Sequence, residues 1–447
     1  PVAPPLMTKW GESLDAEAIL GKHPRPSMVR PEWESLNGAW NYEIKDANKS
    51  VVQDGQITVP FVIESALSGV RRALPEGGAL WYERALNVKP VEGKRYLLHF
   101  EACDYTCKVL VNGRPVGVHR GGSTPFEFDV TDELLHGANS IRVKVKDKMD
   151  MFQLRGKQTA DPEGMFYSGS TGLWQTVWLE TVPTFYIESL HIKTTIGQSR
   201  LRHFGTIKVF PFVAGTVPVD SWLYTTVVKV FEQGGVEVGQ AVCEGICPKV
   251  KLSIQDARLW TPDDPYLYGM VVSLLKDGSI VDEVASYTGI REVGRRRDRH
   301  GHYRMTLNGQ FIFSFGVLDQ GWWPDGHLTP PSEEAMRSDV RLLKRAGYNT
   351  IRKHMKVEPR RYYAYCDRIG MLVWQDQVAS PDCVKSMQPC RPWMTYDWGP
   401  EIENGSSFEY TWPKAAHEQY MEELGEMMHT LYNFPSIVVW VPFNEAW

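Results

Sequence analysis

The sequence lacks both a long apolar run and an excess of positive charge. No stretch of the 447 residues approaches the ~20 apolar residues that a membrane-spanning helix needs, so we expect no membrane protein. Its 49 Lys and Arg are outnumbered by 54 Asp and Glu, which gives a net charge of −5. Proteins bind phosphate backbones through clustered Lys and Arg, so we expect no nucleic acid partner.

Cysteine is also scarce. The seven cysteines are an odd number, and none has the C-x-x-C or Cys/His spacing of a metal site. We therefore expect neither a bound metal nor a cofactor. The disulfide pairing stays open; two pairs lie four residues apart and a third pair shares a loop: Cys103 and Cys107, Cys243 and Cys247, Cys383 and Cys390.

A signal segment with a basic and then an apolar part is missing after the first residue, which is Pro1 rather than Met. We therefore expect that any targeting peptide was removed or never included. Asn48 and Asn404 each begin a glycosylation sequon. These short motifs slightly favour a secreted or extracytoplasmic location and leave the compartment otherwise open.

Aromatic residues, by contrast, are abundant. The chain has 16 Trp, and 12% of its residues are aromatic. Flat aromatic faces can stack on the C–H faces of sugar rings, although most of these side chains are expected to pack in cores. Because single cores stop growing at roughly 250 to 300 residues, the length predicts about two to four domains.

The first 292 residues predict two β-sandwiches. Residues 1–184 contain short apolar or alternating runs separated by Asn-Gly, Gly-Gly and Pro-containing turns, the pattern of a β-sandwich. Asn112-Gly113 predicts a tight hairpin, because both residues accept the positive φ that such a turn requires. Residues 185–292 form a second β-rich segment, whose length suits an immunoglobulin-like sandwich of roughly 100 residues.

Residues 293–447 predict an α/β unit. A hairpin at Asn308-Gly309 is followed by apolar strands that alternate with amphipathic helices. Ser332 is expected to begin a helix, and Gly347 and Gly370 to end helices. The predicted strands are residues 312–317, 350–352, 371–375 and 437–443, and the predicted helices are residues 332–346, 359–369 and 414–432.

This unit is too short for a complete β/α barrel. A complete barrel needs roughly 250 residues, whereas about 150 follow position 300. We therefore predict the N-terminal half of such a barrel. A half barrel would expose unpaired strand edges and an apolar interior. Either the natural chain continues, or a second copy or a partner chain completes the barrel.

Polar and aromatic side chains follow all four predicted strands. In barrels of this kind, catalytic groups lie at the C-terminal ends of the strands and meet at one mouth. The acid Glu445 follows an amide and precedes an aromatic residue at the fourth strand end. Glycosidic bond cleavage needs a proton donor, a partner for a sugar hydroxyl and a stacking surface. The candidate residues are Asp319, Trp322, Trp323, Arg352, His354, Trp374, Asp376, Asn444 and Glu445.

These motifs, taken in order, resemble glycoside hydrolase family 2, which includes β-galactosidases, β-glucuronidases and β-mannosidases. In the barrel, the matching stretches are residues 308–317 (NGQFIFSFGV), 347–352 (GYNTIR), 366–373 (CDRIGMLV) and 433–445, which begin NFPSIVVW and end in Asn-Glu. Upstream, residues 172–180 (GLWQTVWLE) resemble the end of the family's sugar-binding jelly roll. Residues 260–268 (WTPDDPYLY) resemble the end of its immunoglobulin-like domain. The resemblance covers nearly the whole chain.

The resemblance implies roles for the residues at the strand ends. Glu445 would be the general acid/base, and Asn444 would hydrogen bond a sugar hydroxyl beside the reacting carbon. Arg352 would hold carboxylates in their ionised form, or it forms a structural salt bridge only.

The other strand-end residues are candidates for binding the sugar. His354, Asp376 and Asp319 would bind hydroxyls; a packed histidine and loop-capping aspartates are the alternatives. Trp322, Trp323 and Trp374 are stacking candidates, with core packing expected for one or two of them.

Two features depart from the family. Residues 377–382 (QVASPD) lack the acid and histidine that bind magnesium in large bacterial β-galactosidases, so the resemblance supports no metal. A retaining mechanism also needs a second carboxylate about 5 to 5.5 Å from the first, and no residue matches the family's nucleophile. Glu401, Glu403 and Glu409 lie in an insertion without a motif that would recruit them.

The sequence thus leaves three functional interpretations. The first is a retaining exo-β-glycosidase, β-galactosidase-like, whose nucleophile lies beyond Trp447. The second is a non-catalytic carbohydrate-binding or structural protein. The third is one chain of a split enzyme. The partner expected from the resemblance is a carbohydrate substrate.

Overall fold

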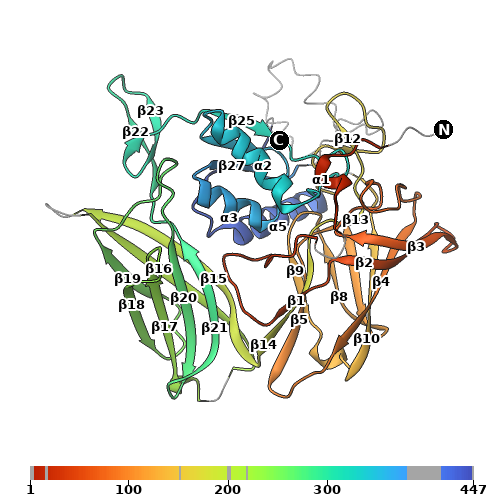
Figure 1. Ribbon diagram of the computed structural model, residues 1–447, viewed down its shortest axis with the longest axis horizontal. Helices are drawn as coiled ribbons and strands as arrows, with labels where there is room; N and C mark the ends of the chain where they lie inside the picture. The colour runs from red at the N-terminus through yellow and green to blue at the C-terminus, as the bar shows by residue number, and fades with distance from the viewer. Residues whose placement is uncertain are drawn as a thin grey trace.

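The computed structural model describes residues 5–15, 19–150, 153–198, 203–217, 220–379 and 414–444. Two β-sandwiches lie side by side, and an α/β unit lies above and between them (Figure 1). This arrangement confirms the predicted fold class of a jelly roll, an immunoglobulin-like sandwich and a partial β/α barrel. The domain limits at residues 184 and 292 remain predictions.

The first sandwich consists of a four-stranded sheet, β1-β14-β5-β9, and a six-stranded sheet, β3-β2-β4-β10-β7-β8. In β10, alternate residues Ile141, Val143 and Val145 are buried in the core between the sheets. The elements are α1 (Lys9–Glu12), β1 (Trp33–Ser35), β2 (Gly38–Lys45), β3 (Val51–Val59), β4 (Ala79–Val88), β5 (Lys94–Phe100), β6 (Cys103–Asp104), β7 (Thr106–Val111), β8 (Arg114–Arg120), β9 (Phe126–Asp129), η1 (Thr131–Glu133), β10 (Gly137–Lys146), β11 (Gln158–Thr159), β12 (Tyr167–Ser168), β13 (Gly172–Leu173) and β14 (Val177–Pro183).

The predicted hairpin at Asn112-Gly113 is confirmed between β7 and β8. Both residues have positive φ, 51° and 78°, which matches the twist of the strands that they join. Disulfides join Cys103 to Cys107 and Cys243 to Cys247.

The second sandwich packs sheet β15-β16-β19 against sheet β18-β17-β20-β21, with antiparallel pairing throughout. Alternating residues of β17 fill its core. The elements are β15 (Phe185–Gln198), β16 (His203–Gly215), η2 (Ser221–Leu223), β17 (Tyr224–Phe231), β18 (Glu237–Glu244), β19 (Val250–Gln255), β20 (Tyr268–Lys276) and β21 (Ser279–Thr288).

The α/β unit contains a parallel sheet in the order β25-β26-β27-β28. Its apolar residues pack against the helices in one buried cluster. The elements are the three-stranded sheet β22 (Val293–Arg297), β23 (Tyr303–Leu307) and β24 (Gln310–Phe311), then β25 (Gly316–Asp319), α2 (Glu333–Arg345), β26 (Thr350–Lys353), α3 (Arg360–Ile369), β27 (Leu372–Asp376), α5 (Lys414–Leu431) and β28 (Ile437–Val441).

Helix ends follow the sequence signals. The Ser332 hydroxyl accepts a 3.0 Å hydrogen bond from Ala335 N and begins α2, and Gly370 ends α3 with a φ of 73°. The first strand, however, begins four residues later than predicted, at Gly316. The Asn349 side chain bonds Phe313 O and Phe315 N instead, so these backbone groups are not available for strand pairing.

Among the described strands, β25 and β28 each pair on one side only. Large apolar side chains near these edges are exposed, including Phe315 at 51%, Leu318 at 50% and Phe443 at 49%. The sheet is therefore part of a barrel with two open edges.

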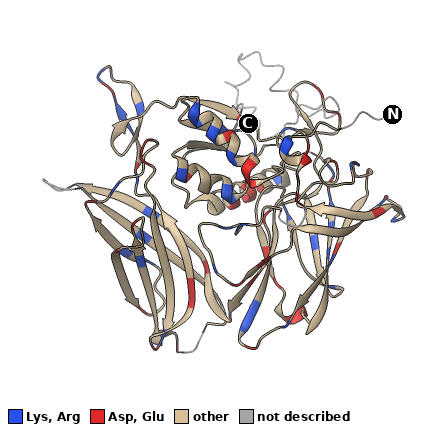
Figure 2. Cartoon of the chain, viewed as in Figure 1, with Lys and Arg blue, Asp and Glu red and all other residues tan. Residues whose placement is uncertain are grey.

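Buried polar contacts join the three parts. Arg30 contacts Glu180 of the first sandwich at 3.0 Å and Asp282 of the second at 2.7 Å. Arg360 of α3 contacts Glu101 at 2.6 Å. Lys and Arg are interspersed with Asp and Glu over the described parts (Figure 2). No described helix is both long and apolar enough to cross a membrane.

Candidate functional site

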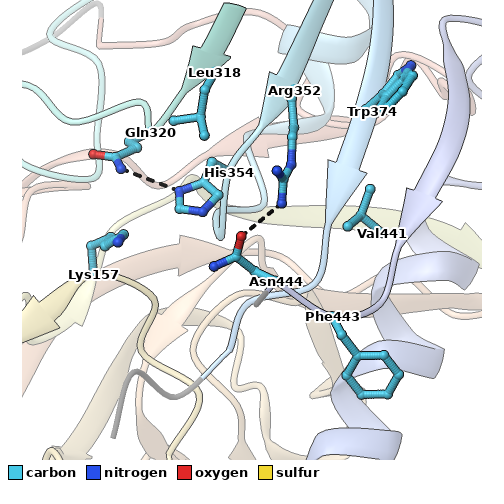
Figure 3. A pocket seen from close by; sticks show the side chains of 9 residues that line it. All are labelled: Lys157, Leu318, Gln320, Arg352, His354, Trp374, Val441, Phe443 and Asn444. Carbon is cyan, nitrogen blue, oxygen red and sulfur yellow. Dashed lines mark hydrogen bonds between the residues drawn. The ribbon is translucent and has the colours of Figure 1, made fainter. Parts of the chain in front are cut away.

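A pocket of about 590 Å³ lies at the C-terminal ends of the parallel strands. Strands β25 to β28 and the residues that follow them supply most of its lining, and the first sandwich supplies Lys157 (Figure 3). The lining residues are Lys157, Leu318, Gln320, Arg352, His354, Trp374, Val441, Phe443 and Asn444.

Arg352 connects three of the strand ends. From β26, its Nε and Nη2 donate hydrogen bonds of 2.9 and 2.8 Å to the two oxygens of Asp376, at the end of β27. Its Nη2 also donates 2.9 Å to Asn444 Oδ1, after β28 (Figure 3). Burial raises the pKa of the Asp376 carboxyl, and the hydrogen bonds from Arg352 limit that rise. Asp376 lies behind the arginine, so it orients Arg352 rather than lining the pocket.

His354 lines the pocket two residues after Arg352. Its Nδ1 lies 3.4 Å from Gln320 Nε2. Burial lowers the pKa of the His354 imidazole, while a hydrogen bond with Asn444 opposes the decrease. A neutral imidazole can both donate and accept a hydrogen bond, so His354 can bind a sugar hydroxyl at neutral pH.

Asp319 is held outside the lining of the pocket. Its Oδ2 accepts 2.9 Å from Lys353 Nζ, and its Oδ1 accepts 2.8 Å from Gly321 N. Lys353 is 1% exposed and also pairs with Glu358. Burial by itself would raise the pKa of the Asp319 carboxyl, but Lys353 lowers it below its usual range. This ion pair fixes the end of β25.

The three candidate tryptophans have different positions. Trp374 lines the pocket, and its Nε1 is buried without a partner among the described residues. Trp322 stacks on Tyr167, with ring centres 4.4 Å apart, and packs against a buried cluster. Trp323 is 9% exposed and meets Trp10 edge to face. Only Trp374 is placed to contact a pocket ligand.

The proposed acid/base Glu445 lies outside the described residues, one position after Asn444. The same is true of Glu401, Glu403 and Glu409, and of the pair Cys383 and Cys390. In the described ranges, no group of three or more His, Cys, Asp or Glu is arranged to hold a metal ion.

Two polar lining residues were not among the predicted site residues. Gln320 directly follows Asp319 at a strand end, so its position was a usable signal. Lys157 comes from the first sandwich, and no periodicity in the sequence indicates that this loop reaches the barrel.

Comparison with known proteins gives three matches along the chain. Residues 55–183 match "Glycosyl hydrolases family 2, sugar binding domain", and residues 213–291 match "Glycosyl hydrolases family 2". Residues 304–447 match "Glycosyl hydrolases family 2, TIM barrel domain". These matches follow the order of the two sandwiches and the α/β unit.

Individual relatives agree with these matches. A β-galactosidase of Thermoanaerobacter pseudethanolicus is 26% identical over 77% of this chain and 44% of its own length. A β-glucuronidase of Bacteroides fragilis is 24% identical over 92% of this chain and 56% of its own length. The chain thus spans about half the length of the curated relatives it matches.

A solved structure has the same fold. It is a Bifidobacterium dentium β-glucuronidase complexed with coumarin-3-O-glucuronide, with a TM-score of 0.72 and 21% identity over 92% of this chain and 68% of that one. The three ordered matches show that the chain belongs to glycosyl hydrolase family 2.

Proposed function

We propose that the protein is a retaining exo-β-glycosidase that removes terminal β-linked sugars, with β-galactosides as the first candidates. The observation that carries this proposal is the contact between Arg352 and Asn444 at the mouth of the partial barrel. It fixes the residue that immediately precedes Glu445. The family resemblance supports Glu445 as the proposed acid/base.

The described side chains provide binding rather than covalent chemistry. Asn444 and His354 offer hydrogen-bonding groups to sugar hydroxyls, and Trp374 offers its aromatic ring, from three different strand ends. Several fixed partners around one sugar hold the glycosidic bond in one orientation, which lowers the entropic part of the barrier. Protonation of the leaving oxygen is the part assigned to Glu445.

The nucleophile is proposed to come from outside these 447 residues. None of the nine residues that line the described pocket is a carboxylate. A retaining glycosidase forms a covalent glycosyl-enzyme on a second carboxylate, which water then hydrolyses. Further residues of the same polypeptide or a partner chain would supply that group and cover the open edges of β25 and β28.

The test compares two leaving groups in one variant. In the polypeptide or complex that completes the barrel, Glu445→Gln should reduce hydrolysis of an unactivated β-galactoside by several orders of magnitude. Hydrolysis of a dinitrophenyl β-galactoside should fall much less, because this leaving group needs no proton. Glu418→Gln, on the exposed face of α5, is the matched control and should leave both rates unchanged. Equal losses on both substrates would contradict the acid/base role. Binding of sugars with no hydrolysis by the unaltered protein with its complete barrel would favour the non-catalytic alternative.

A further inference from the structure

The loop that carries Lys157 is fixed against the barrel. Gly156 N donates 2.9 Å to Ala379 O. A Cβ on Gly156 would lie 2.6 Å from Met355 O, and the φ of this residue is 61°. Only glycine therefore allows this close approach. The first sandwich and the segments after β26 and β27 meet here without a gap.

The backbone on both sides of Lys157 is also anchored. Arg155 donates 2.8 Å hydrogen bonds to the carbonyls of Met149 and Asp150. Tyr167 N donates 2.9 Å to Lys157 O, and β11 and β12 pair directly after these residues. The position from which the Lys157 side chain enters the pocket is thus set by the loop.

The same loop contacts the polar side of the pocket. The Tyr167 hydroxyl donates 2.6 Å to Gln320 Oε1, while its ring stacks on Trp322. Gln320 in turn lies 3.4 Å from His354. Figure 3 shows Lys157 and Gln320 on the His354 side of the pocket, with Trp374 and Phe443 on the Arg352 side.

Lys157 brings a charge that no described carboxylate neutralises. Its Nζ lies 3.3 Å from Met165 Sδ and 5.4 Å from the centre of the Phe166 ring. These neighbours can hold the side chain but carry no negative charge. Arg352, in contrast, is already paired with Asp376. Because low-dielectric walls strengthen the field inside a cleft, the described lining attracts an anion on the Lys157 side.

We propose that Lys157 is a specificity-determining residue that binds an anionic substituent, a carboxylate or a sulfate ester, on the sugar held in the pocket. This inference rests on the proposed function, because it assigns the substrate class of the same site. The ammonium donates charge-assisted hydrogen bonds to the substituent, while Asn444 and His354 bind hydroxyls. Tyr167 and Gln320 keep the Lys157 loop and His354 at a fixed separation.

The experiment uses the protein with its complete barrel and measures binding of three sugars by calorimetry at low and high salt. They are methyl β-galactoside, methyl β-galacturonide and methyl β-galactoside 6-sulfate. The protein should bind at least one anionic sugar about ten- to hundredfold more tightly than the neutral one, because a charged hydrogen bond contributes about 1.5–3 kcal/mol. The anionic sugar that binds more tightly identifies the substituent. Salt should reduce the preference.

Three variants separate charge from folding. Lys157→Met keeps the apolar stem. It should lower the affinity for the anionic sugars to that for the neutral sugar, whose own affinity should not change. Lys157→Arg should retain the preference. Lys146→Met, on the exposed end of β10, should leave the affinities for all three sugars unchanged. Melting temperatures confirm that each variant folds.

Two results would overturn the inference and leave the proposed function standing. One is hydrolysis of a neutral β-galactoside by a protein that binds all three sugars equally. The other is an equal loss of neutral and anionic binding in Lys157→Met, which would make Lys157 a general positioning residue. If the protein with its complete barrel neither binds nor hydrolyses any of the three sugars, both the assignment of galactosides and the role of Lys157 are wrong.

Discussion

Arg352 and Asp376 form a two-pronged pair, with hydrogen bonds of 2.9 and 2.8 Å, at the ends of adjacent strands. The Asp376 side chain is 0% exposed, whereas that of Arg352 is 33% exposed. The carboxylate therefore lies behind the guanidinium and fixes its plane. The remaining contact of Arg352, to Asn444, is made from this fixed plane.

Replacing Arg352 tests whether its geometry matters beyond its charge. Arg352→Lys keeps the positive charge but loses the planar fork that contacts Asp376 and Asn444 together. We expect kcat/KM for a nitrophenyl β-galactoside to fall about 100-fold, because small displacements of catalytic groups cost rates of this order. Arg368→Lys, near the end of α3, is the control. Unchanged kcat/KM in Arg352→Lys would mean that the pair is structural only.

Trp374 provides a prediction about substrate binding. The aromatic ring of Trp374 lines the pocket, whereas its Nε1 is buried without a partner in the described part of the chain. If the ring stacks on a sugar, Trp374→Leu removes this contact and should raise KM about tenfold with little change in kcat. Trp323→Leu, away from the pocket, should leave KM unchanged. A KM that is equally unaffected in both variants would exclude Trp374 as a ligand of the sugar.

The pair of Arg360 with Glu101 predicts a stability difference between buried and exposed ion pairs. Glu101 is 4% exposed, and it also accepts 2.8 Å from Trp178 Nε1. Arg360→Met leaves this carboxylate buried without its cation, which should reduce the free energy of unfolding by about 3–5 kcal/mol. Arg258→Met removes an exposed pair with Asp264 and should have little effect. Urea denaturation of both variants measures the difference, and similar midpoints would contradict the prediction.

Asp367 predicts a dependence of stability on pH. Burial raises the pKa of this carboxyl to about 7, although hydrogen bonds from Ser436 and Tyr287 oppose the rise. The unfolded value is about 3.9, so the stability contribution is complete below pH ~4 and is lost as the pH rises through 7.

In Asp367→Asn, the loss of stability with rising pH should disappear. The amide oxygen can still accept from Ser436 N, and its nitrogen can donate to the Tyr287 hydroxyl. Between pH 5 and 7 the unaltered protein should lose up to about 1.4 kcal/mol per pH unit relative to the variant. Urea midpoints at several pH values measure this difference. Parallel pH profiles for the two proteins would show that Asp367 is ionised in the folded state.

Local structure and the barrel part of the site could be predicted from the sequence, because both depend on short-range patterns. Ser332, Gly370 and Asn112-Gly113 have φ preferences or side-chain bonds that act within a few residues. Parallel strands place their C-terminal ends at one edge, so Arg352, His354, Asp376 and Asn444 come together. The start of the first strand was wrong, because Asn349 binds the backbone at Phe313 and Phe315 from 34 or more positions away.

Contacts between domains could not be predicted in this way. Arg30, Glu180 and Asp282 lie far apart in the sequence, and a single charged residue carries no signal of its partner. The same reason applies to Lys157. Its role in the pocket depends on how the first sandwich packs against the barrel, which is decided by Gly156, Arg155 and Tyr167 together.

The close contact between Gly156 and Met355 joins two walls of the pocket that come from distant parts of the chain. Strands of the barrel hold the groups assigned to bond cleavage, while a loop about 200 residues earlier in the chain forms the opposite wall. Because Gly156, Arg155 and Tyr167 fix the loop, its other side chains can vary without disturbing this contact. An exchange of residues 153–171 between relatives should therefore alter the sugar preference that we propose for Lys157 and leave the strand ends of the barrel unchanged.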